Sequence, residues 1–209
     1  MTEQDQLAIL QQGREVWNQW RQEHQSIQPD FSGVDFTGAH LGRVNLAGAR
    51  LNGADFSGAD LREALLIRAD LRKAILSQAQ LVRADLQGAN LTAAILSDAN
   101  LSDAILSNAF LSDADFSGAI LTGAEVTGTD FSGVDFSDAD LTGIDFSKAN
   151  THGARLGKAY FSRRSDMLLD ESYQQSLRAD TQRRQGKQLA GFDVEDLDER
   201  VHMDWANEE

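Results

Sequence analysis

The 209-residue chain contains no cysteine and only one proline. Without cysteine there is no disulfide framework, zinc–thiolate site, iron–sulfur cluster or thiol nucleophile, so the fold must hold by packing alone. Long apolar runs are also missing, and none approaches the roughly 18 residues that a membrane span requires. The opening residues, MTEQDQLAIL, carry acids where a secretory signal has a basic region. We therefore expect a cytoplasmic protein that does not associate with membranes.

Basic residues are scarce, with 19 Lys and Arg against 33 Asp and Glu, a net charge of -14 and a pI near 4.6. This charge opposes direct binding to nucleic acid or anionic lipid and suits a basic partner better. The net charge is -1 over residues 1–83, -11 over 84–147, +5 over 148–192 and -7 over 193–209. The acidity is therefore concentrated in two segments of the chain.

A large apolar residue occupies every fifth position from Phe31 to Phe161, which gives 27 consecutive units without an insertion. Apart from Val126 and Thr151, all of these central residues are Leu or Phe. Alanine lies two positions before the centre in 21 of the 27 units, and glycine lies two positions after it in 12. A period of five fits neither a helix nor a long strand, so each unit is predicted to be a very short strand followed by a corner.

Within a unit, the alanine and the central residue are two apart and should both face inward, while the residue between them faces solvent. Glycine two positions after the centre suits a type II turn, which needs a positive φ there. Where Lys73, Arg83, Asp98, Asp103 or Asn108 takes that place, we expect a different turn.

The repeated unit resembles the pentapeptide repeat family, as in A-N-L-T at 89–92 and A-D-F-S-G at 114–118. The resemblance covers residues 29–163. It implies an all-β solenoid, a right-handed quadrilateral β-helix with one unit on each side and four units in each coil. Stacked at about 4.8 Å, 27 units would form a rod roughly 32 Å long with a continuous leucine column inside.

Both ends of such a rod need covering. Residues 1–28 are predicted to hold a capping helix over residues 6–24, with Arg21 away from its apolar side and Ile9, Leu10, Gly13, Val16, Trp17 and Trp20 on that side. Residues 164–186 are predicted to form a C-terminal helix that begins at Ser165. Residues 187–209 form an acidic amphipathic tail that either folds back on the rod or docks on a partner.

Candidate partner-binding residues come from two places. Six apolar residues occupy outward positions within a span of 56 residues: Leu65, Ile75, Ile95, Ile105, Phe110 and Ile120. Of these, Ile75 and Ile95 are twenty apart and should touch, while Ile105 and Phe110 should lie on adjacent faces. The tail adds four apolar residues at helical spacing: Val194, Leu197, Val201 and Trp205. The acids of residues 84–147 fall on different faces, so they should surround the rod.

No motif for catalysis is present. The four histidines, His24, His40, His152 and His202, have no partners at metal-binding spacing. The serines are turn residues of the repeat, and a convex, close-packed rod offers no obvious substrate cleft. The chain is therefore predicted not to be an enzyme and to carry no cofactor.

Two functions remain open. The first is a regulatory or adaptor module that binds cytoplasmic proteins; the segment WNQWRQEHQSIQPDFSG resembles cyanobacterial pentapeptide repeat proteins, some of which are linked to regulation of cell differentiation. The second is DNA mimicry. Members of the quinolone-resistance group present an acidic rod to type II topoisomerases such as gyrase and form homodimers through a rod end, and the acidic coils 84–147 fit this idea. Neither function involves direct binding to nucleic acid.

Overall fold

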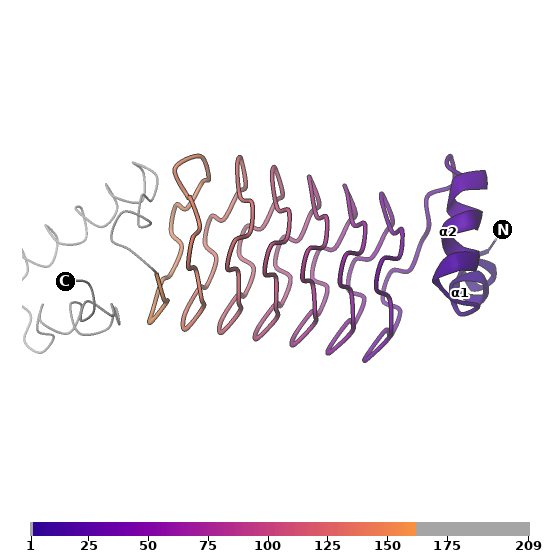
Figure 1. The fold of residues 1–209 in the computed structure, drawn as a ribbon, viewed down its shortest axis with the longest axis horizontal. Coiled ribbons are helices and arrows are strands. Elements are labelled where there is room, and N and C mark those ends of the chain that lie inside the picture. The colour runs from indigo at the N-terminus through magenta and orange to yellow at the C-terminus, as the bar shows by residue number, and fades with distance from the viewer. Residues whose placement is uncertain (1, 162–209) are drawn as a thin grey trace, which may run out of the picture.

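The computed structural model describes residues 2–161. Two helices, α1 (Glu3–Leu10) and α2 (Arg14–Glu23), lie at one end of a row of stacked coils (Figure 1). Parallel backbone pairings join residues that are 20 positions apart, such as Asp30 with Arg50 and Ile75 with Ile95. Each coil therefore holds four units of five residues, which confirms that prediction.

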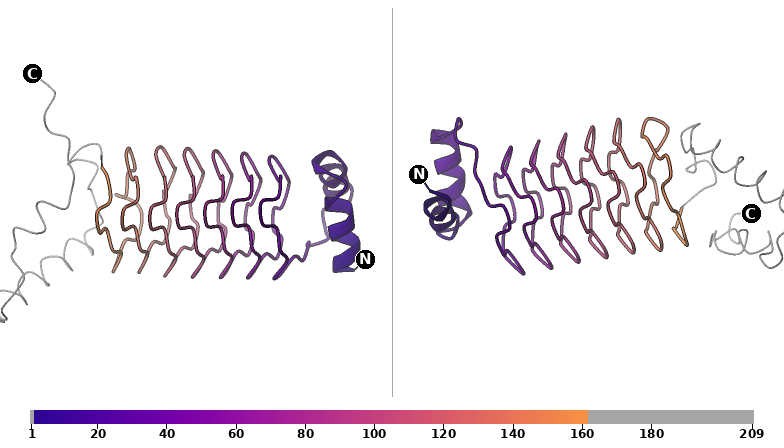
Figure 2. Two further views of the ribbon diagram at one scale, coloured as in Figure 1. Left: turned by 90° about the horizontal axis from the view of Figure 1, so that it is seen from below. Right: turned by 180° about the vertical axis from the view of Figure 1, so that it is seen from behind.

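Each side of a coil contributes one paired residue to the ladder, so the pairings between residues 30 and 160 are isolated bridges without longer strands. The N–H of Leu71 donates to the carbonyl of Asn90 at 2.7 Å, and the N–H of Asn90 donates back to the carbonyl of Ala69 at 2.9 Å. The same two bonds recur on the other sides, except between Glu125 and Asp145, which are not paired in the described ladder. These bonds hold the coils in the regular row that both views of Figure 2 show.

The interior of the rod is filled by the central residues and the alanines, as the period predicted. Leu46, Leu71 and Leu106 are fully buried, and so are Ala54 and Ala99. Toward the far end of the described rod, four phenylalanines replace leucines, and their rings pack with centroids 5.3 to 6.3 Å apart: Phe116, Phe131, Phe136 and Phe146. Stacking thus buries a core that no single coil could form.

The corners correct one prediction, because glycine and non-glycine units make the same turn. Lys73, Arg83 and Asp98 have φ of 57°, 59° and 57°, close to the 67° of Gly118. Twelve non-glycine residues in the described chain adopt this left-handed conformation. It costs an L-residue roughly 1–2 kcal/mol. Backbone hydrogen bonds to the coils on either side fix the conformation of the corner. Whichever residue stands there therefore adopts a positive φ despite its cost.

At the N-terminal end, the single helix expected over residues 6–24 is instead two helices, because Gly13 has a φ of 106°. Trp17 and Trp20 are buried as expected. Arg21 is also buried, however, and Val16 is 43% exposed, so the two are the reverse of what the sequence indicated. The face that α2 turns to the rod is selected by hydrogen bonding as well as by apolar area.

This face of α2 supplies the ladder bonds that a preceding coil would otherwise make. The N–H of Asn45 donates to Asn18 Oδ1 at 2.8 Å, and the Asn45 carbonyl accepts from Trp17 Nε1 at 2.8 Å. The Ala47 carbonyl accepts from Arg21 Nη2 at 2.9 Å. The open edge of the first coil is therefore satisfied by side chains. The expected C-terminal helix (164–186) and tail (187–209) lie outside the described residues.

Candidate interaction surface

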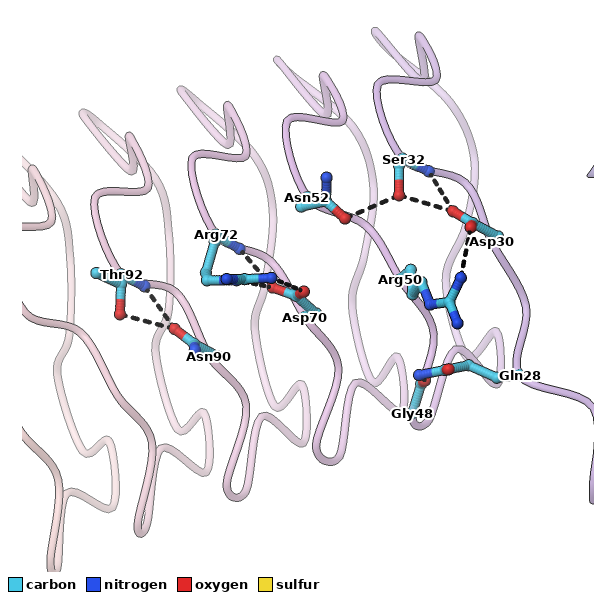
Figure 3. A network of polar contacts seen from close by, with 10 residues as sticks. All are labelled: Gln28, Asp30, Ser32, Gly48, Arg50, Asn52, Asp70, Arg72, Asn90 and Thr92. Atoms are coloured by element: carbon cyan, nitrogen blue, oxygen red, sulfur yellow. Dashed lines mark hydrogen bonds and ion pairs between the residues drawn. The ribbon is translucent and has the colours of Figure 1, made fainter.

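The outward position of each unit does more than face solvent when it holds Asp or Asn. Asn90 Oδ1 accepts the backbone N–H of Thr92 at 3.1 Å and the Thr92 hydroxyl at 2.7 Å. Asp30 Oδ1 accepts from the N–H and hydroxyl of Ser32 in the same way (Figure 3). These bonds hold the entry to the corner, which explains why Asp or Asn is so often followed two positions later by Ser or Thr.

Several of these carboxylates are also held by arginine. Asp70 accepts two hydrogen bonds from Arg72, at 2.8 and 2.7 Å, and Arg62 binds Asp60 in the same bidentate manner. These side-chain bonds lower the pKa of Asp70 and of Asp60 below the usual carboxyl range. The arginines of the early coils are therefore largely engaged with neighbouring acids, as Figure 3 shows for Arg72.

The six apolar residues predicted to face outward cannot make this turn-holding bond. Leu65, Ile95 and Ile120 are each 39% exposed, and Phe110 is 53% exposed. Ile75 and Ile105 are half-buried. Four of the six are thus exposed as expected, while the other two are partly covered.

These apolar residues do not gather on one face. Ile75 and Ile95 are paired in adjacent coils, as predicted. The other four lie beside polar partners, because Leu65 and Ile105 both pair with Asp85, Phe110 pairs with Asn90 and Asp130, and Ile120 pairs with Asn100 and Asp140. The four sides of the rod each hold at least one of the six, and Ile75 and Ile95 are the only two of them that are paired with each other.

Tyr160, which was not among the six predicted residues, is 46% exposed in the same outward position. It pairs with Asp140 and so lies in the column of Ile120. The rule that found the other six would have found it too, because an aromatic residue stands there between Ala159 and Phe161. The tail residues Val194, Leu197, Val201 and Trp205 lie outside the described part of the chain.

The acids of residues 84–147 fall in different columns of the rod, as expected. Asp115 pairs with Asp135, whereas Asp130 pairs with Phe110 and Asp140 pairs with Ile120. The negative charge therefore surrounds these coils instead of forming one stripe.

An open hollow of about 300 Å³ lies beside the first coils, lined by Arg14, Gly42, Arg43, Asp60, Arg62 and Glu63. Its arginines are paired: Arg43 binds Glu63 at 2.9 Å and Arg62 binds Asp60 at 2.7 Å. The bond from Arg43 lowers the pKa of Glu63. In residues 2–161, no group of three or more His, Asp or Glu side chains is placed to hold a metal ion, and no helix is long and apolar enough to cross a membrane.

The sequence model for pentapeptide repeats matches residues 30–66, 64–97, 94–133 and 127–163, with eight copies of the repeat. The chain belongs to the pentapeptide repeat family. A comparison with curated proteins finds no match to the chain.

Three solved structures illustrate the likeness, the first two of them pentapeptide repeat proteins. A thylakoid lumen protein of Arabidopsis thaliana is 33% identical over 53% of this chain and 66% of its own length, with a TM-score of 0.28. HetL, involved in heterocyst differentiation regulation in the cyanobacterium Nostoc sp. strain PCC 7120, is 27% identical over 64% of this chain and 76% of its own, with a TM-score of 0.30. QnrB1, a plasmid-mediated fluoroquinolone resistance protein, is 22% identical over 74% of this chain and 87% of its own, with a TM-score of 0.28.

Proposed function

We propose that this pentapeptide repeat protein is a non-enzymatic, cytoplasmic adaptor or regulatory module that binds other proteins. The observation that carries the proposal is the replacement of turn-holding Asp or Asn by exposed Leu65, Ile95, Phe110 and Ile120. Each replacement gives up a hydrogen bond to the corner and places apolar area in water, which benefits the rod only weakly. Binding to a partner would bury these apolar side chains and so explain why they stand at exposed positions.

The rod is suited to this role because its surface is ordered before binding. A coil whose backbone is bonded to both neighbours loses little conformational freedom when a partner docks, so less of the interaction energy is spent on ordering. The right-handed sense of the coil belongs to the same proposal and rests on the family resemblance. A helical C-terminal cap over 164–186 also belongs to it and rests on Ser165 as an N-cap and on the spacing of the apolar residues that follow.

The strongest single contact in this proposal is the side that carries Ile75 and Ile95. Along this column the apolar pair lies between Asp55 and Asp115, with which the two isoleucines are paired in the ladder. An apolar segment flanked by Lys or Arg would match it, since the basic residues would meet the two carboxylates. This chemistry agrees with the net charge of the chain.

The alternative function is a DNA-mimicking modulator of type II topoisomerase such as gyrase. It is supported by the eleven acids and absence of bases in residues 84–147. It is weakened by the spread of those acids over several columns, because a mimic of duplex phosphates needs rows of charge at a protein-facing surface. An adaptor that uses local apolar contacts places no such demand on the acids.

Affinity capture from a lysate of the source cells separates the two functions. Full-length protein, a 1–192 truncation, and the double variant Ile75→Lys with Ile95→Lys are compared at low and moderate salt. The matched control is Gln80→Lys with Asn100→Lys, which adds the same charge at a paired position on the adjacent side. All four proteins are first checked for equal thermal stability.

The adaptor proposal expects a protein retained at moderate salt and lost from the Ile75/Ile95 variant but not from the control. Gyrase or topoisomerase IV subunits that bind all variants and dissociate as salt rises would support the alternative. If a partner binds the Ile75/Ile95 variant as well as it binds the Gln80/Asn100 control, the side of the rod that carries Ile75 and Ile95 is not its binding site. Loss of a partner with the truncation would place its contact on residues 193–209.

A further inference from the structure

One corner of the rod carries an unbroken column of charged residues. Arg43, Glu63, Arg83 and Asp103 occupy equivalent corner positions in four successive coils, with φ of 61°, 58°, 59° and 56°. Their backbones are joined in series, because the N–H of Glu63 donates to Val82 in the next coil and the N–H of Arg83 donates to Ser102. The four Cα–Cβ bonds therefore leave the corner in nearly the same direction, and the charges alternate in sign along the rod axis. The Asp103 carboxylate lies beside Gly123 of the next coil, where a Cβ would be only 2.5 Å from its Oδ1.

The other three corner columns do not share this arrangement. Each contains glycine within any four successive coils, as in Gly38 and Gly58 of one column and Gly48 and Gly88 of another. Glycine adopts a positive φ without strain, whereas the four charged residues hold a conformation that L-residues disfavour. A strained conformation kept at four consecutive positions is a reason to look for a function of their side chains.

Half of the column is not held by a side-chain hydrogen bond or close ion pair in the described rod, although Arg83 helps Arg43 to lower the pKa of Glu63. Arg43 binds Glu63 through Nε and Nη2, at 2.9 and 3.0 Å. Within residues 2–161, neither the Arg83 guanidinium nor the Asp103 carboxylate makes a side-chain hydrogen bond or ion pair, and both residues are exposed. The Arg43 and Glu63 side chains still have free donors and acceptors.

The geometry points to lateral self-association: a second copy of this chain, lying antiparallel, pairs with the rod along this column. A two-fold axis midway between Glu63 and Arg83 places Arg43 against the partner's Asp103 and Glu63 against the partner's Arg83, twice each. An alternating column with an even number of charges is complementary to its own reverse, so all four contacts join opposite signs. In a parallel, in-register pairing every contact would join like charges.

The hollow beside the first coils agrees with this pairing. It is lined by Arg43 and Glu63 at one end of the column, together with Arg14 and with Arg62, which is bound to Asp60. In the antiparallel pair it receives the carboxylate of the partner's Asp103, which can accept hydrogen bonds from the donors that Arg43 leaves free. This lateral contact lies on the side of the rod and is separate from any contact through a rod end.

Sedimentation equilibrium of the full-length protein tests the inference at about 0.01 to 1 mM, because a small and polar interface binds weakly. We expect a monomer–dimer equilibrium at about 0.05 M salt that shifts toward monomer at about 0.5 M salt. The variants Arg83→Glu and Glu63→Arg each bring like charges together twice and should raise the dissociation constant by about tenfold or more. Arg68→Glu is the matched control, because it makes the same charge change as Arg83→Glu on an exposed residue of another corner. It should leave the dissociation constant unchanged.

The deciding measurement mixes the two variants. In a mixture, Glu63 of one variant meets Arg83 of the other, and the introduced Glu and Arg meet each other, so a heterodimer should form although neither variant associates alone. A monomer at all concentrations at low salt would overturn the inference. It would also be overturned if Arg83→Glu and Arg68→Glu weakened association equally, or if the mixed variants stayed monomeric while their melting temperatures matched the parent.

Discussion

Replacing Gly118 by alanine should destabilise the rod more than the same change at Gly58. Both glycines occupy the same corner column, with φ of 67° and 64°, so alanine costs roughly 1–2 kcal/mol at either position through backbone strain. The two sites differ in their surroundings. A Cβ at Gly58 would meet nothing within 4 Å, whereas a Cβ at Gly118 would overlap Oδ1 of Asp98 in the preceding coil.

Relief of that overlap requires the Asp98 side chain to leave its rotamer, which adds about 0.5–1.5 kcal/mol. We therefore expect Gly118→Ala to lose roughly 2–3 kcal/mol in urea or thermal unfolding, against about 1–2 kcal/mol for Gly58→Ala. Asp98→Ala removes the obstructing carboxylate. A double-mutant cycle between Asp98→Ala and Gly118→Ala should thus return a coupling close to the difference between the two glycines.

Equal losses at Gly58 and Gly118, together with a coupling near zero, would refute this reasoning. Such a result would mean that the acidic side chain moves aside without cost, and that the corners are independent of one another. Because solenoids can unfold in parts, the comparison uses the transition that reports on the central coils.

Four further outcomes are expected from the structure. Leu106→Asp should unfold the rod by burying an unpaired charge, while Ile105→Asp, one residue away and half-buried at the surface, should keep a melting temperature near that of the parent. Trp17→Phe keeps an aromatic ring at this buried position but removes the indole N–H that donates to the carbonyl of Asn45 in the first coil. Thermal unfolding should therefore show an unfolding free energy lower by about 1–2 kcal/mol. Gln78→Gly, at a φ of 60°, should raise stability by about 0.5–1 kcal/mol in the same assay, opposite to the usual effect of glycine. The hydrogen bonds from Arg72 lower the pKa of Asp70 in the folded state, so ionised Asp70 stabilises the fold above its unfolded-state pKa near 4, and this contribution is lost as the pH falls through the folded-state pKa. The difference in unfolding free energy between the parent and Asp70→Asn should therefore become smaller as the pH is lowered. A difference that does not change with pH would contradict this prediction.

Much of the rod could be read from the period of five. The inward positions of Leu106 and Ala99 follow from it, because residues two apart in an extended segment face the same way. The pairing of Ile75 with Ile95 follows once four units form a coil. These features depend only on local geometry repeated along the chain.

Other features depended on contacts between coils, which no single unit contains. The unit around Asp98 lacks the glycine that a left-handed corner prefers, so local preference predicted another turn, yet its neighbours in the stack impose the same φ. The burial of Arg21 had the same origin, because it depends on the open carbonyl of Ala47 at the end of the rod.

The sequence by itself determined the repeat, its core and the total charge, because each of these is fixed by residue type and spacing. Only the tertiary structure decided the number of units in a coil, which the residues suggested only through the family resemblance. It separated the six apolar candidates over the four sides of the rod and brought Arg43, Glu63, Arg83 and Asp103 into one column. The reason is that neighbours on this surface are twenty residues apart, so proximity is set by the coil length and not by the order of residues within a unit.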